Sequence, residues 1–312
     1  MKSALFIRGG ALGDFILTLP SIRVFRAAFP DARVEIVGYP RIAALVENRG
    51  YASAVQPLDQ RGMATFFAED ADLDPALCAY LASFDLVVSF LYDPDGVFRR
   101  NLERAGVRRA ITADSRPGPT LHASEHLAAW LEDAGLPRAI ETPRLFPSAA
   151  DAAEAAARHP PPTGPRVALH LGSGSPSKNW PVRRFVELAE RFEAKGIETI
   201  VLDGPADDAA QKQFWATPLP PGIRRCTGLP LTVLAAFLAR CTTFVGHDSG
   251  ITHLAAAVGA PVCAIFGPTD ARVWRPRGAK AVVLQRGRDP ANVTVEDVAR
   301  AAEQGLAAAP AS

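Results

Sequence analysis

Asp14 is the first residue of the chain whose type and position suit chemistry. It ends the first loop, Arg8-Gly9-Gly10-Ala11-Leu12-Gly13-Asp14, which follows a short apolar run and leads into a stretch of helical period. A carboxylate at this position can accept a proton from an incoming hydroxyl group. It can equally cap a helix, a role worth about 1 kcal/mol that needs no ligand. The glycine spacing misses G-x-G-x-x-G, because Arg8 stands where the first glycine would be, and this disfavours a dinucleotide site.

A second loop, His170–Pro181, combines glycines and small hydroxyl residues with Lys178. Ser173 and Gly174 offer hydroxyl and backbone donors, and Lys178 adds a positive charge, so the loop can cradle phosphate oxygens. The alternative is an ordinary capped turn with a solvated lysine, but the clustering of glycine, serine and lysine in one loop favours the anion site. The spacing of a P-loop, G-x-x-x-x-G-K-[ST], is missing, which excludes an ATPase of that class.

The third loop, Gly246–His253, joins an apolar run to a segment of helical period. Asp248, Ser249 and Gly250 stand at the expected start of that helix, where free N–H groups and the helix dipole attract a phosphate. Asp248 can instead cap the helix, and an inward-facing histidine such as His253 is more often structural than catalytic. The glycine and serine are one residue too far apart for a G-x-S-x-G nucleophile elbow, so hydrolase chemistry is poorly supported.

Three further groups of residues suit metal or anion binding less well. His122 and His126 are four apart, but no glutamate follows the first histidine and no third ligand is in view, so we expect structural or surface roles. The four cysteines are scattered without C-x-x-C, which predicts reduced thiols rather than a zinc site or a disulfide framework. Five arginines cluster in the first half and can form a solvated helix face, or meet an anionic acceptor or a membrane surface. They are Arg99, Arg100, Arg104, Arg108 and Arg109.

The composition predicts a globular protein without strong bulk charge. Of 312 residues, 48% are hydrophobic and 21% charged, which is too little charge for a disordered chain. The net charge of +1 excludes a protein that coats nucleic acid by bulk charge. Residues 1–162 carry a formal charge of −3 and residues 163–312 one of +4, so an anionic ligand would favour the second half. The chain shows neither a signal peptide nor about 18 consecutive apolar residues, so we expect a cytoplasmic protein.

The elements that must position these loops follow an alternating pattern. Short apolar runs alternate with segments of helical period, which is typical of a doubly wound parallel sheet. A proline-rich stretch, His159–Pro165, interrupts the alternation. We therefore predict two Rossmann-like lobes, residues 1–160 and 161–312, with all three loops at carboxyl ends of strands, where such sheets bind ligands. Strands are predicted at Ala4–Ile7, Arg33–Val37, Asp85–Ser89, Arg109–Thr112, Arg166–His170, Glu198–Leu202, Thr243–Gly246 and Val262–Phe266. Helices are predicted at Ile16–Phe29, Ile42–Arg49, His122–Ala134, Ala149–Ala157, Val182–Lys195, Asp207–Trp215, Leu231–Ala239 and Ile251–Val258.

In this order and spacing, the loops resemble those of the ADP-heptose:lipopolysaccharide heptosyltransferase family, glycosyltransferase family nine. The resemblance spans nearly the whole chain and implies the GT-B architecture, an α/β fold of two Rossmann-like lobes with parallel sheets facing a central cleft. It also implies an acceptor site on the first lobe, a nucleotide-sugar site on the second, and no metal or other cofactor. The motifs that carry it are Arg8-Gly9-Gly10-Ala11-Leu12-Gly13-Asp14 with Leu19-Pro20, Ser177-Lys178-Asn179-Trp180-Pro181, Asp248-Ser249-Gly250-Ile251-Thr252-His253-Leu254-Ala255-Ala256-Ala257 and Phe266-Gly267-Pro268-Thr269-Asp270.

The resemblance also implies roles for single residues. Asp14 is similar to the general base of the family, and Lys178 is similar to the lysine that binds the donor phosphates; both would be catalytic. An acidic residue would contact the ribose, and Asp207 is the candidate. The implied donor-binding residues are Gly13, Ser173, Gly174, Lys178, Asp207, Asp248, Ser249, Gly250 and His253.

The implied reaction is an inverting, metal-independent transfer of a heptose from ADP-heptose to a lipopolysaccharide-core or related glycan acceptor. The implied partners are a nucleotide-sugar donor and a glycolipid or glycan acceptor, without nucleic acid, and we expect peripheral contact with the cytoplasmic face of the inner membrane. Two alternatives stay open. One is another GT-B enzyme that uses a different nucleotide sugar or acts as an epimerase, and the other is a non-catalytic nucleotide-sugar-binding protein.

Overall fold

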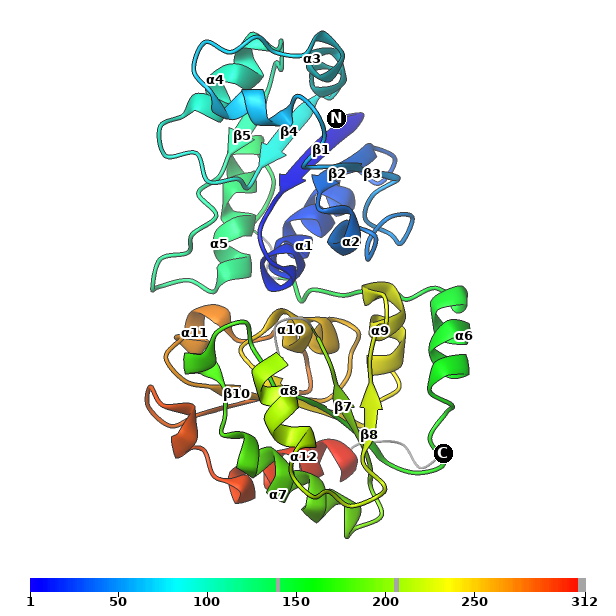
Figure 1. The fold of residues 1–312 in the computed structure, drawn as a ribbon. Coiled ribbons are helices and arrows are strands. Elements are labelled where there is room, and N and C mark those ends of the chain that lie inside the picture. The colour runs from blue at the N-terminus through cyan, green and yellow to red at the C-terminus, as the bar shows by residue number, and fades with distance from the viewer. Residues whose placement is uncertain (139–140, 205–207, 308–312) are drawn as a thin grey trace. The chain divides into compact units, whose positions relative to one another are not determined.

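The computed structural model describes residues 1–138, 141–204 and 208–307, and these form two compact α/β units. The first unit is Met1–Phe146 and the second begins at Pro147 (Figure 1). The sequence pattern predicted that the first lobe ends at residue 160. In the structure, helix α6 (Ala149–Arg158) packs on α9 (Leu231–Leu238), which is part of the second unit.

Five parallel strands form the sheet of the first unit, in the order β3-β2-β1-β4-β5. The chain adds β2 and β3 on one side of β1 and then crosses to β4 on the other side, so the strand order reverses between β1 and β4. The strands are β1 (Ser3–Arg8), β2 (Arg33–Gly38), β3 (Ala54–Pro57), β4 (Leu86–Ser89) and β5 (Ala110–Thr112). The helices are α1 (Leu12–Ala28), α2 (Pro40–Ala43), η1 (Met63–Phe67), α3 (Pro75–Ala82), α4 (Val97–Arg104), α5 (Ala123–Ala129) and η2 (Trp130–Ala134).

Helices cover both faces of this sheet. On one face, Leu5 and Ile7 of β1 join a buried cluster to which α3, α4 and η1 contribute. On the other face, Phe6 packs edge to face on Phe25 of α1, with ring centroids 5.8 Å apart. Because β1 is buried on both faces, it appears in the sequence as an unbroken apolar run.

Six parallel strands form the sheet of the second unit, in the order β11-β10-β9-β6-β7-β8. The register pairs Ala168 with Phe244 and Leu169 with Val245, so β6 and β9 end side by side. The strand order reverses between these two strands, which is where open α/β sheets bind ligands. The strands are β6 (Arg166–His170), β7 (Glu198–Leu202), β8 (Arg224–Cys226), β9 (Thr243–His247), β10 (Val262–Phe266) and β11 (Ala281–Gln285). The remaining helices are η3 (Pro176–Lys178), α7 (Val182–Glu193), α8 (Asp208–Trp215), α10 (Gly250–Ala257), α11 (Ala271–Trp274), η4 (Pro290–Asn292) and α12 (Val295–Ala307).

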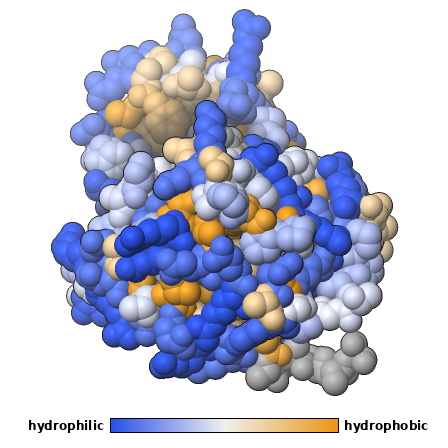
Figure 2. Space-filling view, turned by 60° about the horizontal axis from the view of Figure 1, so that its bottom comes forward, coloured by the Kyte–Doolittle hydropathy of each residue, from blue (hydrophilic) through white to orange (hydrophobic). Residues whose placement is uncertain are grey.

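Helices also pack against the sheet of the second unit. Side chains of α7, α8 and α12, including Phe192, Phe214 and Val298, form one buried cluster with the strands. Helices α9 and α10, which contribute nothing to that cluster, pack together, and α10 also packs on β9 and β10. Within the described residues, no helix is long and apolar enough to cross a lipid bilayer. Polar residues cover most of the face shown in Figure 2, and hydrophobic side chains show only between them.

The predicted helix Ile42–Arg49 is wrong over most of its length. Helix α2 ends at Ala43, and Asn48 has a left-handed φ of 53°, which a right-handed helix cannot contain. Leu45 and Val46 are buried without being helical, so their apolar character reflects burial and not helical period.

Candidate functional site

Asp14 lies in the first turn of α1, three residues after the N-cap residue Ala11. Its Oδ2 accepts a hydrogen bond from the Ala11 backbone N at 3.0 Å, so the carboxylate caps α1 from inside the helix. Gly10 makes this possible, since its φ is 90° and a Cβ there would lie 3.0 Å from the same oxygen. The side chain is still 34% exposed. The capping role therefore leaves the carboxylate open to a ligand.

Arg8, at the end of β1, is the charged neighbour of Asp14. Its buried guanidinium donates from Nη1 to the carbonyl of Phe90 at 2.9 Å, and its Nη2 lies 3.7 Å from Asp14 Oδ1. Burial lowers the pKa of Arg8, and the charge of Asp14 opposes that shift. Because β1 and β4 are neighbours at the reversal of strand order, the bond from Arg8 to Phe90 fixes both strand ends beside Asp14.

Lys178 and Asp248 bring the second and third loops together. Lys178 Nζ lies 2.7 Å from Asp248 Oδ2, although 70 residues separate them in the chain. Asp248 is 8% exposed, whereas the Lys178 side chain is partly exposed. A buried carboxylate thus holds an accessible cation at the carboxyl ends of β6 and β9.

Helix α10 begins beside this ion pair. Ser249 is its N-cap residue and accepts a hydrogen bond from Thr252 N at 3.4 Å. The backbone N–H groups of Gly250 and Ile251 donate to no described residue. Free N–H groups and the positive end of the helix dipole attract anions. Together with Lys178, they form a site suited to phosphate groups.

Ser173 and Gly174 shape the second loop. Ser173 Oγ lies 2.9 Å from the carbonyl of Ser175 and 2.6 Å from Asn179 Oδ1, so its hydroxyl folds the loop on itself. Gly174 has a φ of 75° and open space where a Cβ would stand. The backbone conformation alone therefore favours glycine at this position.

The donor-binding roles predicted from the sequence all stay predictions, including those of Gly13, His253 and Asp207. Gly13 lies within the first turn of α1, in the first unit. His253 is buried in α10 at 5% exposure. Asp207, the candidate ribose contact, lies outside the described residues.

His247, for which the sequence pattern predicted no role, links the second loop to the third. Its Nε2 accepts a hydrogen bond from Trp180 N at 2.7 Å, and its Nδ1 lies 3.4 Å from the carbonyl of Gly172. Because Nε2 is an acceptor, we assign the ring proton to Nδ1. The sequence carried one signal for this role, since a histidine ends a buried strand directly before Asp248.

The histidine pair of the first unit has other partners. His122 is the N-cap residue of α5 and accepts from Ser124 N at 3.2 Å, and His126 Nε2 lies 2.6 Å from the carbonyl of Asp114. All four cysteines are free. Among the residues that the structure describes, no three His, Cys, Asp or Glu side chains come close enough to hold a metal ion.

Three of the five clustered arginines bind side chains of their own unit. The guanidinium groups of Arg99 and Arg100 contact carboxylates, which reduces the charge they present to an anionic surface, whereas Arg104 contacts a neutral amide. The pairs are Arg99–Glu103, Arg100–Glu69 and Arg104–Asn101.

Known proteins resemble this chain in sequence and fold. The family profile described as glycosyltransferase family 9 (heptosyltransferase) matches residues 115–301. Lipopolysaccharide heptosyltransferase 3 of Escherichia coli (strain K12) is 24% identical over 290 residues, which cover 85% of this chain and 82% of that protein. Lipooligosaccharide heptosyltransferase 2 of Haemophilus influenzae is 33% identical over 115 residues, which cover 35% of this chain and only 33% of that relative.

A solved structure supports the fold. It is that of the ADP-heptose lipopolysaccharide heptosyltransferase II of Escherichia coli, with a TM-score of 0.78 and 19% sequence identity. The similarity covers 98% of this chain and 99% of the other. The two α/β units therefore have the Rossmann-like architecture of the GT-B class.

Proposed function

Because this chain belongs to glycosyltransferase family 9, we propose that it transfers a heptose from ADP-heptose to a lipopolysaccharide-core or related glycan acceptor. The observation that carries the proposal is the meeting of Lys178 with the start of α10 at the strand reversal of the second unit. This arrangement supplies a cation and free N–H donors for a diphosphate. We propose ADP-heptose as the donor because the Escherichia coli protein of similar fold is an ADP-heptose lipopolysaccharide heptosyltransferase.

In the proposed mechanism, the acceptor hydroxyl displaces ADP directly from the anomeric carbon. Asp14 accepts the hydroxyl proton, the oxygen forms the new glycosidic bond, and ADP leaves with the electron pair of the broken bond. Lys178 and the N–H groups at the start of α10 stabilise the charge that grows on the leaving diphosphate. A single displacement inverts the configuration at the anomeric carbon.

We also propose that the transfer needs no metal ion, because Lys178 and α10 supply positive charge to the diphosphate. The acceptor would bring the enzyme to the cytoplasmic face of the inner membrane as a peripheral protein. The exposed arginines of the first unit support this part of the proposal through their attraction to anionic headgroups.

Donor screening followed by product analysis tests the function. A donor that binds only the folded protein raises its stability by RT ln(1 + [L]/Kd), so we expect ADP-heptose to raise the Tm more than UDP- and GDP-sugars do. NMR of the transfer product should show inverted anomeric configuration, and transfer should persist in EDTA. Preference for another nucleotide sugar, or epimerisation without transfer, would select one of the alternative enzymes. A strict requirement for a divalent ion would contradict metal independence.

A further inference from the structure

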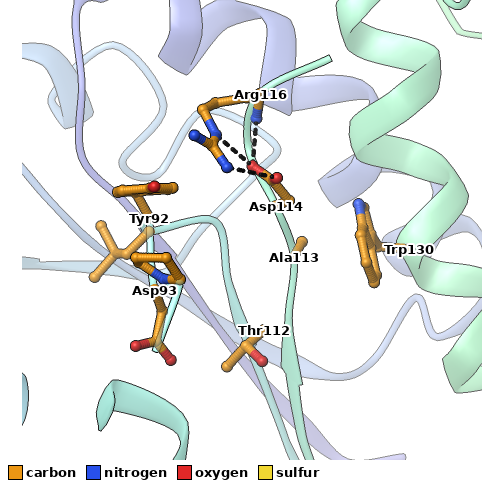
Figure 3. A pocket seen from close by; sticks show the side chains of 9 residues that line it. Tyr92, Asp93, Thr112, Ala113, Asp114, Arg116 and Trp130 are labelled. Atoms are coloured by element: carbon orange, nitrogen blue, oxygen red, sulfur yellow. Dashed lines mark hydrogen bonds and ion pairs between the residues drawn. The ribbon is translucent and has the colours of Figure 1, made fainter. Parts of the chain in front are cut away.

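A pocket of about 350 Å³ lies in the first unit, at the carboxyl ends of β4 and β5 (Figure 3). Its volume falls within the range of small-molecule sites, about 300–1,000 Å³. In Figure 3, Tyr92 and Trp130 lie on opposite sides of Thr112 and Asp114. The pocket thus presents aromatic surface at two ends and polar groups between them.

The pocket adjoins the loop that carries Asp14. Leu91 lines the pocket and lies against Gly9, where an added Cβ would be 3.2 Å from Leu91 Cδ2. The preceding residue, Phe90, accepts the hydrogen bond from Arg8. A ligand in the pocket would therefore lie beside the proposed general base.

The charged groups of the pocket are already paired. Arg116 donates from Nε and Nη2 to the two carboxylate oxygens of Asp114, each at 3.1 Å, and this contact lowers the pKa of Asp114. Asp93 accepts hydrogen bonds from Phe98 N and Arg99 N, both at 3.0 Å, at the start of α4. Because Asp114 neutralises Arg116, the charge of Asp93 leaves the lining with a net negative charge, which a phosphate or carboxylate group would have to approach. The pocket therefore disfavours anions.

Two neutral hydrogen-bonding groups of the pocket have no partner in the described part of the chain. They are Trp130 Nε1 and the Thr112 hydroxyl. Trp130 is only partly buried, and Tyr92 is 52% exposed although the Arg116 guanidinium stacks 4.1 Å from its ring centroid. Aromatic surface with nearby N–H and O–H groups suits a sugar ring, which has an apolar C–H face and neutral hydroxyl groups.

We propose that this pocket binds an uncharged sugar residue of the glycan acceptor. The inference rests on the proposed glycosyltransferase function and deepens it, because it names the part of the acceptor that lies beside Asp14. Phosphate and carboxylate groups of the acceptor would lie outside the pocket.

Trp130 itself reports on the pocket in solution. The chain has four tryptophans, and the indole N–H signal absent from Trp130→Phe identifies Trp130 in a ¹H–¹⁵N NMR spectrum. The full-length protein is titrated with methyl pyranosides of gluco, galacto and manno configuration, and with the 6-phosphates of glucose, galactose and mannose. At least one uncharged pyranoside should move this signal saturably, with a Kd on the order of 1–10 mM. The corresponding 6-phosphate should bind at least about threefold more weakly.

Two matched variants test the Thr112 hydroxyl and the Arg116–Asp114 pair separately. Thr112→Val keeps the shape of the side chain and removes the hydroxyl, so it should weaken pyranoside binding by about threefold or more. Asp114→Asn releases Arg116 from its carboxylate, so it should raise the affinity for the 6-phosphates. A Trp130 signal that no pyranoside moves, tighter binding of the phosphates by the wild type, or unchanged phosphate affinity in Asp114→Asn would overturn the proposal. These titrations need no turnover, whereas failure of the proposed function would appear as absent ADP-heptose binding or transfer.

Discussion

Asp14 combines a structural and a proposed chemical role in one carboxylate. Its Oδ2 holds the first turn of α1 through Ala11, while the side chain keeps a third of its surface exposed. An asparagine at this position could still accept the bond from Ala11 N but could not accept a proton. The two roles can therefore be separated by one substitution.

Asp14→Asn should lower kcat by a factor of about 10²–10⁴, because a general base contributes that much, and should leave ADP affinity unchanged. Steady-state kinetics with ADP-heptose and calorimetric titration with ADP measure the two effects. The matched control is Asp74→Asn, the same change at the N-cap of α3, where Asp74 accepts from Ala76 N and Leu77 N at 2.8 and 3.0 Å. The control should keep normal turnover. Near-normal turnover of folded Asp14→Asn would remove the base assignment.

The phosphate role of Lys178 needs a variant that leaves no unpaired carboxylate. Removing Lys178 alone would strand the buried carboxylate of Asp248, so Lys178→Met/Asp248→Asn is compared with Asp248→Asn. The variant without the lysine should bind ADP about ten- to a hundredfold more weakly than Asp248→Asn, which is the contribution of a hydrogen bond to a charged group. Lys195→Met is the control, because Lys195 pairs with Glu303 elsewhere in the second unit. Equal ADP affinity with and without Lys178 would contradict the assignment.

At the residue scale, the sequence predicted the loops but not their pairing. Glycines, serines and Lys178 in one loop, and Asp248 at a helix start in another, each suggested an anion site. The contact between Lys178 and Asp248 spans 70 residues and depends on the register of β6 against β9, which no local pattern contains. The contacts of His247 could not be predicted for the same reason, since its partners Gly172 and Trp180 lie in a loop that is distant in the sequence.

At the scale of elements, the sequence predicted the central strands and missed three edge strands. Central strands such as β6 and β10 are buried along their whole length. Strand β10 appears as a continuous apolar run, and β6 has a shorter apolar run, 167–169, between Arg166 and His170. The missed strands β3, β8 and β11 lie at sheet edges and are largely half-buried or exposed. Strands β3 and β8 show no such run, whereas the apolar run 281–284 of β11 was left unassigned. All three functional loops follow central strands, and this is why the sequence could locate them.

His247→Phe tests whether the contact between two loops positions Lys178. Phenylalanine keeps the ring but cannot accept the bond from Trp180 N, so the second loop should lose its fixed position and ADP affinity should fall by up to about tenfold. When His247→Phe is introduced into Lys178→Met/Asp248→Asn, the further loss of ADP affinity should be close to zero, because His247 acts through the lysine. His247→Gln, which retains an acceptor, should restore part of the affinity.

The control for His247 is a variant that lowers stability without touching the loops. Val298→Ala in α12 opens a cavity in the core of the second unit and should lower the Tm while leaving the ADP affinity of the folded protein unchanged. A purely structural role for His247 would give equal losses of affinity in both lysine backgrounds. Calorimetric titration of the folded proteins at one temperature distinguishes these outcomes.

At the scale of the whole molecule, charge limits how the enzyme can meet a membrane. The net charge is +1, and no helix among the described residues can span a bilayer. Attraction to anionic lipid would therefore come from local clusters. Of the five clustered arginines, Arg104, Arg108 and Arg109 form no ion pair with a carboxylate within the described residues, and all three are exposed. Arg104 donates to Asn101 Oδ1 and to the carbonyl of Ala71, so Arg108 and Arg109 are the two that form no hydrogen bond or ion pair with a described side chain.

Arg108→Gln/Arg109→Gln should weaken binding to vesicles that contain phosphatidylglycerol by about tenfold or more, since each basic residue near an anionic surface contributes about 1 kcal/mol. Co-sedimentation at low salt measures the partition, and high salt should release the wild type because screening shortens the range of the attraction. Arg183→Gln/Arg288→Gln removes the same charge from exposed positions of the second unit and should change the partition less. Wild-type protein that stays in the supernatant at low salt, or equal losses in both double variants, would show that this arginine cluster does not direct membrane contact.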